Sequence, residues 1–362
     1  MQRPVMHPVF RAEDVTATKK KTPQWKVFFK TKVVGFAKWC VRSMLSSPTA
    51  LGRRPAEAEA RAPLGARLVR GLAYRAMFLP ILVALSCYTL VFTATHPTTV
   101  FSATDPATYG VYSAPVAFES SDGTRLEGWL APVVDAKSVL ERREKLLRTK
   151  HPAVVLVHDF AKPPQQVLPL FAPLHDDGLI VMAVGLRGTN ASTFVTAGQT
   201  FGLKEAEDVT ATVEALRGDP FVDTQRVAIV GVGAGANAAV IAASRDPHIK
   251  ATVLVDALSD PESILREHIG PTRRGLRWMQ PLTKWTFELS YGVDAEDIDL
   301  GRFPEVVRSR PCLQLDSGGD AGFLEKPETQ KKIRDFLCNH LRLEVKPTRK
   351  SGGVTNNPVP RR

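Results

Sequence analysis

Cysteine is scarce in this chain, with four residues among 362: Cys40, Cys87, Cys312 and Cys338. No two of them have the C-x-x-C spacing of a zinc or redox motif, so the sequence predicts no metal site. We expect Cys312, in an apolar strand, and Cys338, in an amphipathic helix, to be buried free thiols. No metal and no cofactor are expected.

Basic residues are not in excess over most of the chain. Residues 76–362 contain 32 Lys/Arg against 33 Asp/Glu, whereas residues 1–75 contain 16 against 4. A nucleic-acid interface needs a basic face, so we expect no binding of nucleic acid. We interpret residues 1–75 as a basic cytoplasmic arm and linker, with the Pro- and Gly-containing residues 46–70 as the linker. Lysines interleaved with aromatic residues over 19–42 favour contact with anionic lipid, and a disordered arm is the alternative.

Charged residues are absent between Ala76 and Ala94. As a helix, these 19 residues would extend about 28 Å, close to the hydrocarbon thickness of a bilayer, and the span assigned is 76–95 with Pro80 in its first turns. We predict a transmembrane helix that acts as a signal anchor, and a buried core helix is the alternative. Three arginines precede the run and one acidic residue follows it closely: Arg67, Arg70, Arg75 and Asp105. The positive-inside rule places the N-terminus in the cytoplasm and the globular part on the periplasmic, extracellular or lumenal side.

Apolar runs of strand length alternate with helical stretches in the rest of the chain. After a tether over 96–114, a hairpin is predicted from 116–119, the turn at Asp122-Gly123, and 126–130. Further strands are expected over 153–157, 179–184, 227–230, 251–255 and 312–315, with helices over 136–147, 203–216 and 235–244. This alternation predicts an α/β fold with a mostly parallel, doubly wound sheet and helices on both faces. The aromatic-rich stretch 262–310 is a possible cap or a set of connecting helices, and residues 357–362 form a tail.

The glycine-rich turn after the strand over 227–230 contains no serine. It reads Gly231-Val232-Gly233-Ala234-Gly235 and leads into an Ala-rich helix. A strand, a sharp turn and a helix are the setting of the G-x-S-x-G nucleophile motif, and Gly233 holds the middle position here. Glycine adopts the positive φ of such a turn without strain.

Together these segments resemble the α/β-hydrolase superfamily, in particular its dienelactone-hydrolase, prolyl-oligopeptidase and acyl-esterase branches. The resemblance covers the domain over 115–356. It rests on the order and spacing of five segments. These are the opening hairpin over 118–130, the strand Val154–Asp159 where the family has His-Gly, the turn Leu186-Arg187-Gly188 with Ser192, the segment Phe221–Val227 before the elbow, and the strand and turn Pro311–Asp320. It implies an α/β-hydrolase-like fold with a serine, a histidine and an acid at one site.

The resemblance assigns the nucleophile to Gly233 and the acid to Asp320. It also implies a histidine in the loop over 350–355, which contains none, and the last histidine of the chain is His340 in an amphipathic helix. Triad residues act as a unit, so the loss of two members removes nearly all of their rate enhancement.

The resemblance places the oxyanion region at Asp159 and Ala234. A carboxylate at position 159 would oppose the negative charge that develops during acyl transfer. The leading hypothesis is therefore a membrane-anchored pseudohydrolase that binds or scaffolds a protein or small-molecule ligand of unknown identity.

An active hydrolase of ester or peptide bonds with displaced groups is a second hypothesis. Its candidate nucleophiles are Ser192, Ser244 and Ser317, and its candidate bases are His158 and His340.

A nucleotide-binding module is the third hypothesis. Gly231, Gly233 and Ala236 fit the dinucleotide fingerprint G-x-G-x-x-G/A, and Asp256 stands where a ribose-binding acid would follow.

Overall fold

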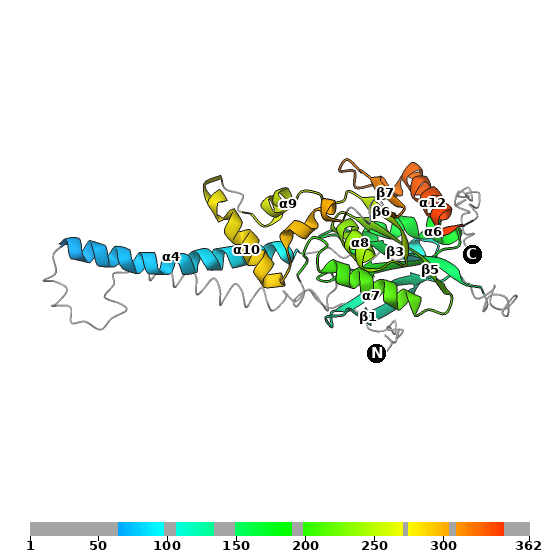
Figure 1. Ribbon diagram of the computed structural model, residues 1–362, viewed down its shortest axis with the longest axis horizontal. Helices are drawn as coiled ribbons and strands as arrows, with labels where there is room; N and C mark the ends of the chain where they lie inside the picture. The colour runs from blue at the N-terminus through cyan, green and yellow to red at the C-terminus, as the bar shows by residue number, and fades with distance from the viewer. Residues whose placement is uncertain are drawn as a thin grey trace, which may run out of the picture.

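The computed structural model describes residues 64–97, 106–133, 149–189, 198–270, 274–303 and 309–343. Expectations for the arm over 1–63, the helix over 136–147 and the C-terminal residues 344–362 lie outside these ranges. The described part consists of one long helix, α4 (Leu64–Thr95), and a globular domain built around one sheet (Figure 1).

The sheet has seven strands in the described ranges, in the order β1-β2-β4-β3-β5-β6-β7. Their bounds are β1 (Ala114–Glu119), β2 (Arg125–Ala131), β3 (His151–Val157), β4 (Ile180–Gly185), β5 (Val222–Val232), β6 (Ile249–Val255) and β7 (Cys312–Leu315). Strands β3 to β7 are parallel, and β2 is antiparallel to both β1 and β4. Each strand expected from the sequence is present, so the mostly parallel α/β-hydrolase-like architecture is confirmed.

Helices cover both faces of the sheet. Helices α7 (Glu205–Arg217) and α8 (Ala234–Arg245) pack with one buried cluster, while α6 (Phe171–Asp176) and α12 (Pro327–Leu341) pack with the other. Short 3-10 helices cover Pro106–Tyr109, Pro164–Leu170 and Phe323–Glu325. Strand β3 sends alternate residues into the two clusters, which explains why its sequence is apolar without interruption. Cys338 is buried and Cys312 half-buried, and both are free thiols.

A segment of short helices connects β6 to β7, where a cap or connecting helices were expected. It contains α9 (Pro261–His268), a 3-10 helix (Arg274–Met279), α10 (Gln280–Tyr291), and two further 3-10 turns, Ala295–Ile298 and Leu300–Arg302. The Asp260 side chain caps α9 by accepting the N–H groups of Glu262 and Ser263, and Gly292 ends α10 in a left-handed conformation.

Helix α4 is longer than the predicted span over 76–95. It begins at Leu64, so the expected linker over 46–70 is wrong in its last residues, and Pro80 lies in the helix interior rather than in its first turns. Pro63, just before the helix, is the start signal that the sequence contained. By length and composition, the segment Phe78–Thr95 of α4 could cross a membrane.

The C-terminal end of α4 is part of the globular domain. Val91 and Thr95 are buried, and the Thr95 hydroxyl lies 2.6 Å from the Tyr291 hydroxyl of α10. The expected tether over 96–114 is also shorter than predicted, because Val111 is buried in the core. The apolar helix therefore ends against the domain rather than at a free linker.

Candidate functional site

The predicted strand–turn–helix elbow is present at the carboxyl end of β5. Gly233 has φ +55° and ψ −121°, and its N–H donates to the Val255 carbonyl over 2.8 Å. Ala234 begins α8 directly afterwards. A Cβ on Gly231 would lie 2.7 Å from the Cα of Ala236, so the close approach of strand and helix also requires glycine there.

The side chain of Asp159 fills the space beside Gly233. Its Oδ1 accepts the N–H of Ala234 over 2.9 Å and the N–H of Phe160 over 2.6 Å. A Cβ on residue 233 would lie 2.7 Å from Oδ2 and closer still to the rest of the carboxylate. The N–H of Asp159 donates to the Gln166 side chain over 2.8 Å, which holds the loop after β3 in place.

The two N–H groups bound by Asp159 are those that would serve as oxyanion donors. In an α/β-hydrolase the donors are the N–H of the residue after the nucleophile and an N–H from a neighbouring loop, here Ala234 and Phe160. Asp159 also places its charge at the N-terminus of α8, where the helix dipole favours an anion. The expected carboxylate in the oxyanion region is thus more than a nearby repulsive charge, because it occupies the donors itself.

Burial raises the pKa of Asp159 above its usual value, and the charge of Asp256 acts in the same direction. The hydrogen bonds from Ala234 and Phe160 and the charge of Lys162 oppose the rise. A substrate oxyanion would have to displace this side chain from both N–H groups before it could be stabilised.

His158, a candidate base, is fully buried with both ring nitrogens in use. Its Nε2 accepts the backbone N–H of Leu186 over 3.0 Å, so Nδ1 carries the hydrogen and donates to the Asp159 carbonyl over 2.8 Å. Burial lowers the pKa of His158 to about 4, so the ring is neutral at physiological pH. Its role is to join the ends of β3 and β4, and it is not placed to accept a proton from a nucleophile.

The neutral His158 makes stability depend on pH. An unfolded histidine titrates near 6.5, so the unfolded state binds the extra proton between about 6.5 and 4 and stability falls as the pH falls through that window. The difference corresponds to about 3 kcal/mol. We expect His158→Gln, which keeps one donor and one acceptor, to remove this part of the acid sensitivity of the unfolding free energy. The exposed His248→Gln is the matched control, and an equal pH slope in the two variants would contradict the assignment.

The remaining candidate residues lie apart from Gly233 or are engaged elsewhere. Asp320 is exposed and pairs with Lys326 over 2.6 Å, which lowers its pKa, rather than meeting an imidazole. His340 is exposed on α12, with its ring against Phe336.

Two of the three candidate serines can be placed. Ser244 is exposed near the far end of α8 from the elbow, and its hydroxyl donates to the Ile241 carbonyl over 2.6 Å. The Ser317 hydroxyl accepts the N–H of Gly319 over 3.1 Å. Ser192 lies outside the described residues. Neither placed serine stands at the elbow.

The nucleotide hypothesis is not supported by this geometry. A dinucleotide phosphate would use the N–H groups at the start of α8, but Ala234 already donates to Asp159. The carboxylate would also repel a phosphate. The proposed ribose-binding acid, Asp256, accepts the N–H of Ser317 over 2.7 Å.

Comparison with known proteins decides the family. The model of the X-Pro dipeptidyl-peptidase (S15) family matches residues 64–296. The chain belongs to this family. The match confirms the resemblance to acyl-esterase-like and prolyl-peptidase-like α/β-hydrolases that the sequence suggested.

Individual relatives of this S15-family chain are distant. A polyketide transferase, grgF, from a Penicillium species is 25% identical over 152 residues, which cover 41% of this chain and 47% of that protein. The chain thus matches about half the length of that relative. Among solved structures, the Pyrococcus furiosus esterase Pf2001 is 15% identical, covers 68% of this chain and 97% of its own, and has a TM-score of 0.49. The Pyrococcus horikoshii acylaminoacyl peptidase is 18% identical, covers 66% of this chain and 43% of its own, and has a TM-score of 0.41.

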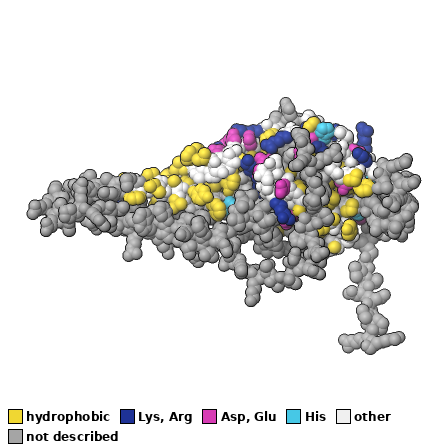
Figure 2. All heavy atoms as spheres, turned by 90° about the horizontal axis from the view of Figure 1, so that it is seen from below, with side chains coloured by type: hydrophobic (Ala, Val, Ile, Leu, Met, Phe, Trp, Pro, Cys, Tyr) yellow, Lys and Arg dark blue, Asp and Glu magenta, His cyan; other side chains and the backbone are white. Residues whose placement is uncertain are grey.

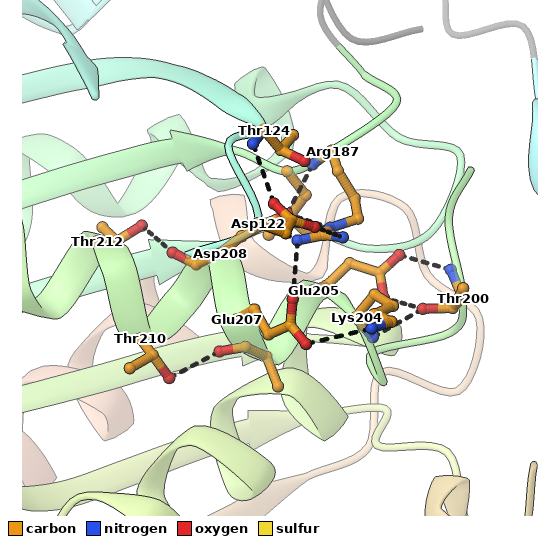
Figure 3. A network of polar contacts seen from close by, with 12 residues as sticks. Asp122, Thr124, Arg187, Thr200, Lys204, Glu205, Glu207, Asp208, Thr210 and Thr212 are labelled. Carbon is orange, nitrogen blue, oxygen red and sulfur yellow. Dashed lines mark hydrogen bonds and ion pairs between the residues drawn. The ribbon is translucent and has the colours of Figure 1, made fainter. Parts of the chain in front are cut away.

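A buried ionic network beside the site of this S15-family chain was not predicted from the sequence (Figure 3). Arg187, at the end of β4, bonds Asp208 of α7 through Nε and Nη2, the latter over 2.6 Å, and bonds Asp122 of the β1–β2 turn over 2.8 Å. Burial raises the pKa of Asp208 to about 6 against the opposing hydrogen bonds from Arg187, so the carboxylate is still ionised at neutral pH. The sequence contained the Arg187-Gly188 turn, but it could not identify the acidic partners of Arg187 because they lie far away along the chain.

Gln199 connects this network to the site loop and to α4. Its N–H donates to the Thr95 carbonyl over 2.7 Å, and its side-chain oxygen accepts the N–H of Ala161 over 2.8 Å. Its side-chain nitrogen lies 3.4 Å from the carbonyl of Arg187. The loop that contains Asp159 is therefore joined to the end of the apolar helix through one residue, whose side chain bonds the loop and whose backbone bonds α4.

Proposed function

We propose that this S15-family chain is a pseudohydrolase held at a membrane by α4, with a binding or scaffolding role in place of catalysis. The observation that carries the proposal is the position of Asp159, whose Oδ1 accepts the N–H groups of both Ala234 and Phe160 beside a glycine at the nucleophile position.

Acyl transfer needs a nucleophile, a base and free oxyanion donors at one place. Gly233 supplies no nucleophile, and the donors at Ala234 and Phe160 are occupied by a negative charge. His158 is locked as a neutral structural residue, and the sequence has no histidine after His340. Three independent requirements therefore fail together.

The membrane part of the proposal is supported by the apolar segment Phe78–Thr95 and by the arginines that precede it in the sequence. The N-terminal arm would lie in the cytoplasm, with residues 19–42 against anionic lipid, and the globular domain would lie on the other side. The elbow would then face a ligand, protein or small molecule, outside the cytoplasm.

Hydrolysis by displaced groups is the alternative, and one observation favours it. The ring of His268 lies against Phe160, the residue next to Asp159, with ring centroids 5.4 Å apart. This contact places an imidazole near the loop that contains Asp159, and histidine is the commonest general base in enzymes. The family match also names peptidases.

Activity measurements on the purified full chain separate the two functions. We expect no site-specific labelling by a fluorophosphonate and no turnover of short-chain acyl esters or of aminoacyl and X-Pro amides. The fluorophosphonate detects an activated serine, and the ester and amide panel also detects a carboxylate mechanism. Turnover that disappears in Asp159→Asn or His268→Gln would establish the alternative and end the pseudohydrolase proposal.

A further inference from the structure

A stripe of large apolar side chains is exposed along α10 and the 3-10 helix before it. Trp278, Leu282, Trp285 and Leu289 are 57%, 39%, 61% and 68% exposed. Within α10, the spacing of Leu282, Trp285 and Leu289 (i, i+3 and i+7) places them on one side of the helix. Trp278 and Leu276, the latter 40% exposed, lie in the 3-10 helix directly before it. A contiguous apolar surface of this kind marks a site of interaction rather than ordinary surface.

The opposite side of α10 is fixed to the domain. Phe287 is fully buried with its ring centroid 6.1 Å from that of Phe201, and Thr283 is buried as well. Tyr291 bonds Thr95 at the end of α4. Because α10 has one buried apolar side and one exposed apolar side, packing within the domain does not account for the stripe.

Helix α10 packs directly against α4. Both helices lie at the same end of the molecule, beyond the edge of the sheet (Figure 1). Leu79, Ile81 and Tyr88 of α4 are exposed as well. On the face seen in Figure 2, hydrophobic side chains gather along the narrow half of the described surface, whereas charged side chains lie over the globular half. The stripe therefore lies on a helix that packs against the segment able to cross a membrane.

The polar residues around the stripe suit the boundary between lipid and water. Arg277 is exposed between Leu276 and Trp278, and Lys284 is paired with Glu296, so its charge is already neutralised. Tryptophan is enriched where hydrocarbon meets headgroups, and an exposed arginine at that depth reaches lipid phosphates.

We propose that this stripe, Trp278, Leu282, Trp285 and Leu289, is inserted into the interface of the bilayer that α4 crosses. The inference rests on the proposed membrane anchor and goes beyond it, because it adds a second element of the domain in contact with the bilayer. Two elements in contact with the same bilayer fix the orientation of the domain, with the cap side of the sheet against the membrane. The occupant of the stripe is lipid, because α4 holds it next to lipid in every molecule.

Tryptophan quenching in vesicles tests this docking. All variants are made in a full-length W25F/W39F chain, which serves as the wild-type reference, because Trp25 and Trp39 lie in the arm proposed to contact anionic lipid. This chain is reconstituted into phosphatidylcholine–phosphatidylserine vesicles with acyl chains brominated near the headgroup, and its tryptophan emission is compared with that in unbrominated vesicles. We expect W278F/W285F to lose the larger part of the bromine-sensitive emission. W129F, which changes a half-buried tryptophan of the sheet, is the matched control and keeps it.

Flotation of the same vesicles distinguishes the possible failures. Protein that floats while W278F/W285F is quenched like the wild type overturns the docking and leaves the anchor in place. Protein that does not float overturns the anchor and the docking together. A dimer crosslinked through Leu289→Cys would show that a second copy covers the stripe and would also overturn the proposal.

Discussion

Gly233→Ser is expected to lower the free energy of unfolding by about 3 kcal/mol or more, and to produce no esterase activity. A side chain at 233 would overlap the Asp159 carboxylate, which must then leave the N–H groups of Ala234 and Phe160. The backbone at φ +55° adds strain for any residue other than glycine. We expect no turnover, because the histidine next to the elbow, His158, is held by backbone groups at both ring nitrogens and cannot accept the serine proton. Denaturant unfolding and an acyl-ester assay measure the two effects.

Matched variants distinguish the cost of steric overlap with Asp159 from the cost of backbone strain at residue 233. Gly292→Ser has a similar φ of +62° with open space around the position, so it is expected to cost only about 1 kcal/mol. In Asp159→Gly/Gly233→Ser the overlap is gone, so the serine is expected to cost about 1–3 kcal/mol relative to Asp159→Gly alone. If Gly233→Ser is as stable as Gly292→Ser, or if it turns over esters, Asp159 does not fill the site as described.

The sequence was sufficient for the features that depend on local pattern. Uninterrupted apolar runs predicted the parallel strands, and glycines at 231 and 233 predicted the elbow, because each follows from a few neighbouring residues. The absence of a serine at the elbow could be read in the same way.

Features that depend on distant contacts could not be predicted in the same way. Asp159 lies 75 positions from Ala234, and the pairing of Thr95 with Tyr291 spans 196. The sequence indicated a carboxylate near the oxyanion region but not that it binds both donors. Asp320 was assigned by its place after a strand, and only the fold shows that its partner is Lys326.

These distant contacts converge on one corner of the sheet, where β3 and β4 end. His158 joins the two strand ends, Gln199 ties the site loop to α4, and Arg187 ties β4 to α7 and to the β1–β2 turn. A catalytic site keeps such a corner rigid to hold reacting groups. Here the same contacts hold a carboxylate at the elbow, as expected if the scaffold serves the proposed binding role in place of catalysis.

Asp208→Ala is expected to lower the free energy of unfolding by about 3–5 kcal/mol, because it leaves the buried Arg187 guanidinium without its main partner. Asp208 is fully buried, and its carboxylate accepts Nε, Nη2 and the backbone N–H of Arg187. Lys326→Ala breaks an ion pair of similar length at the surface, where solvent screens the charges, and is expected to change the free energy of unfolding much less. Chemical denaturation of the two variants in the same detergent gives the comparison.

The double variant Arg187→Met/Asp208→Leu separates unpaired charge from lost packing. Replacing both ions of a buried pair by apolar groups of similar volume is often close to neutral, so the double variant is expected to recover at least about half of the loss. Asp122, the other strong partner of Arg187, is partly exposed and can turn to water. A double variant as unstable as Asp208→Ala would contradict this account. It would show instead that the hydrogen bond from the Arg187 backbone, which the leucine cannot accept, holds β4 against α7.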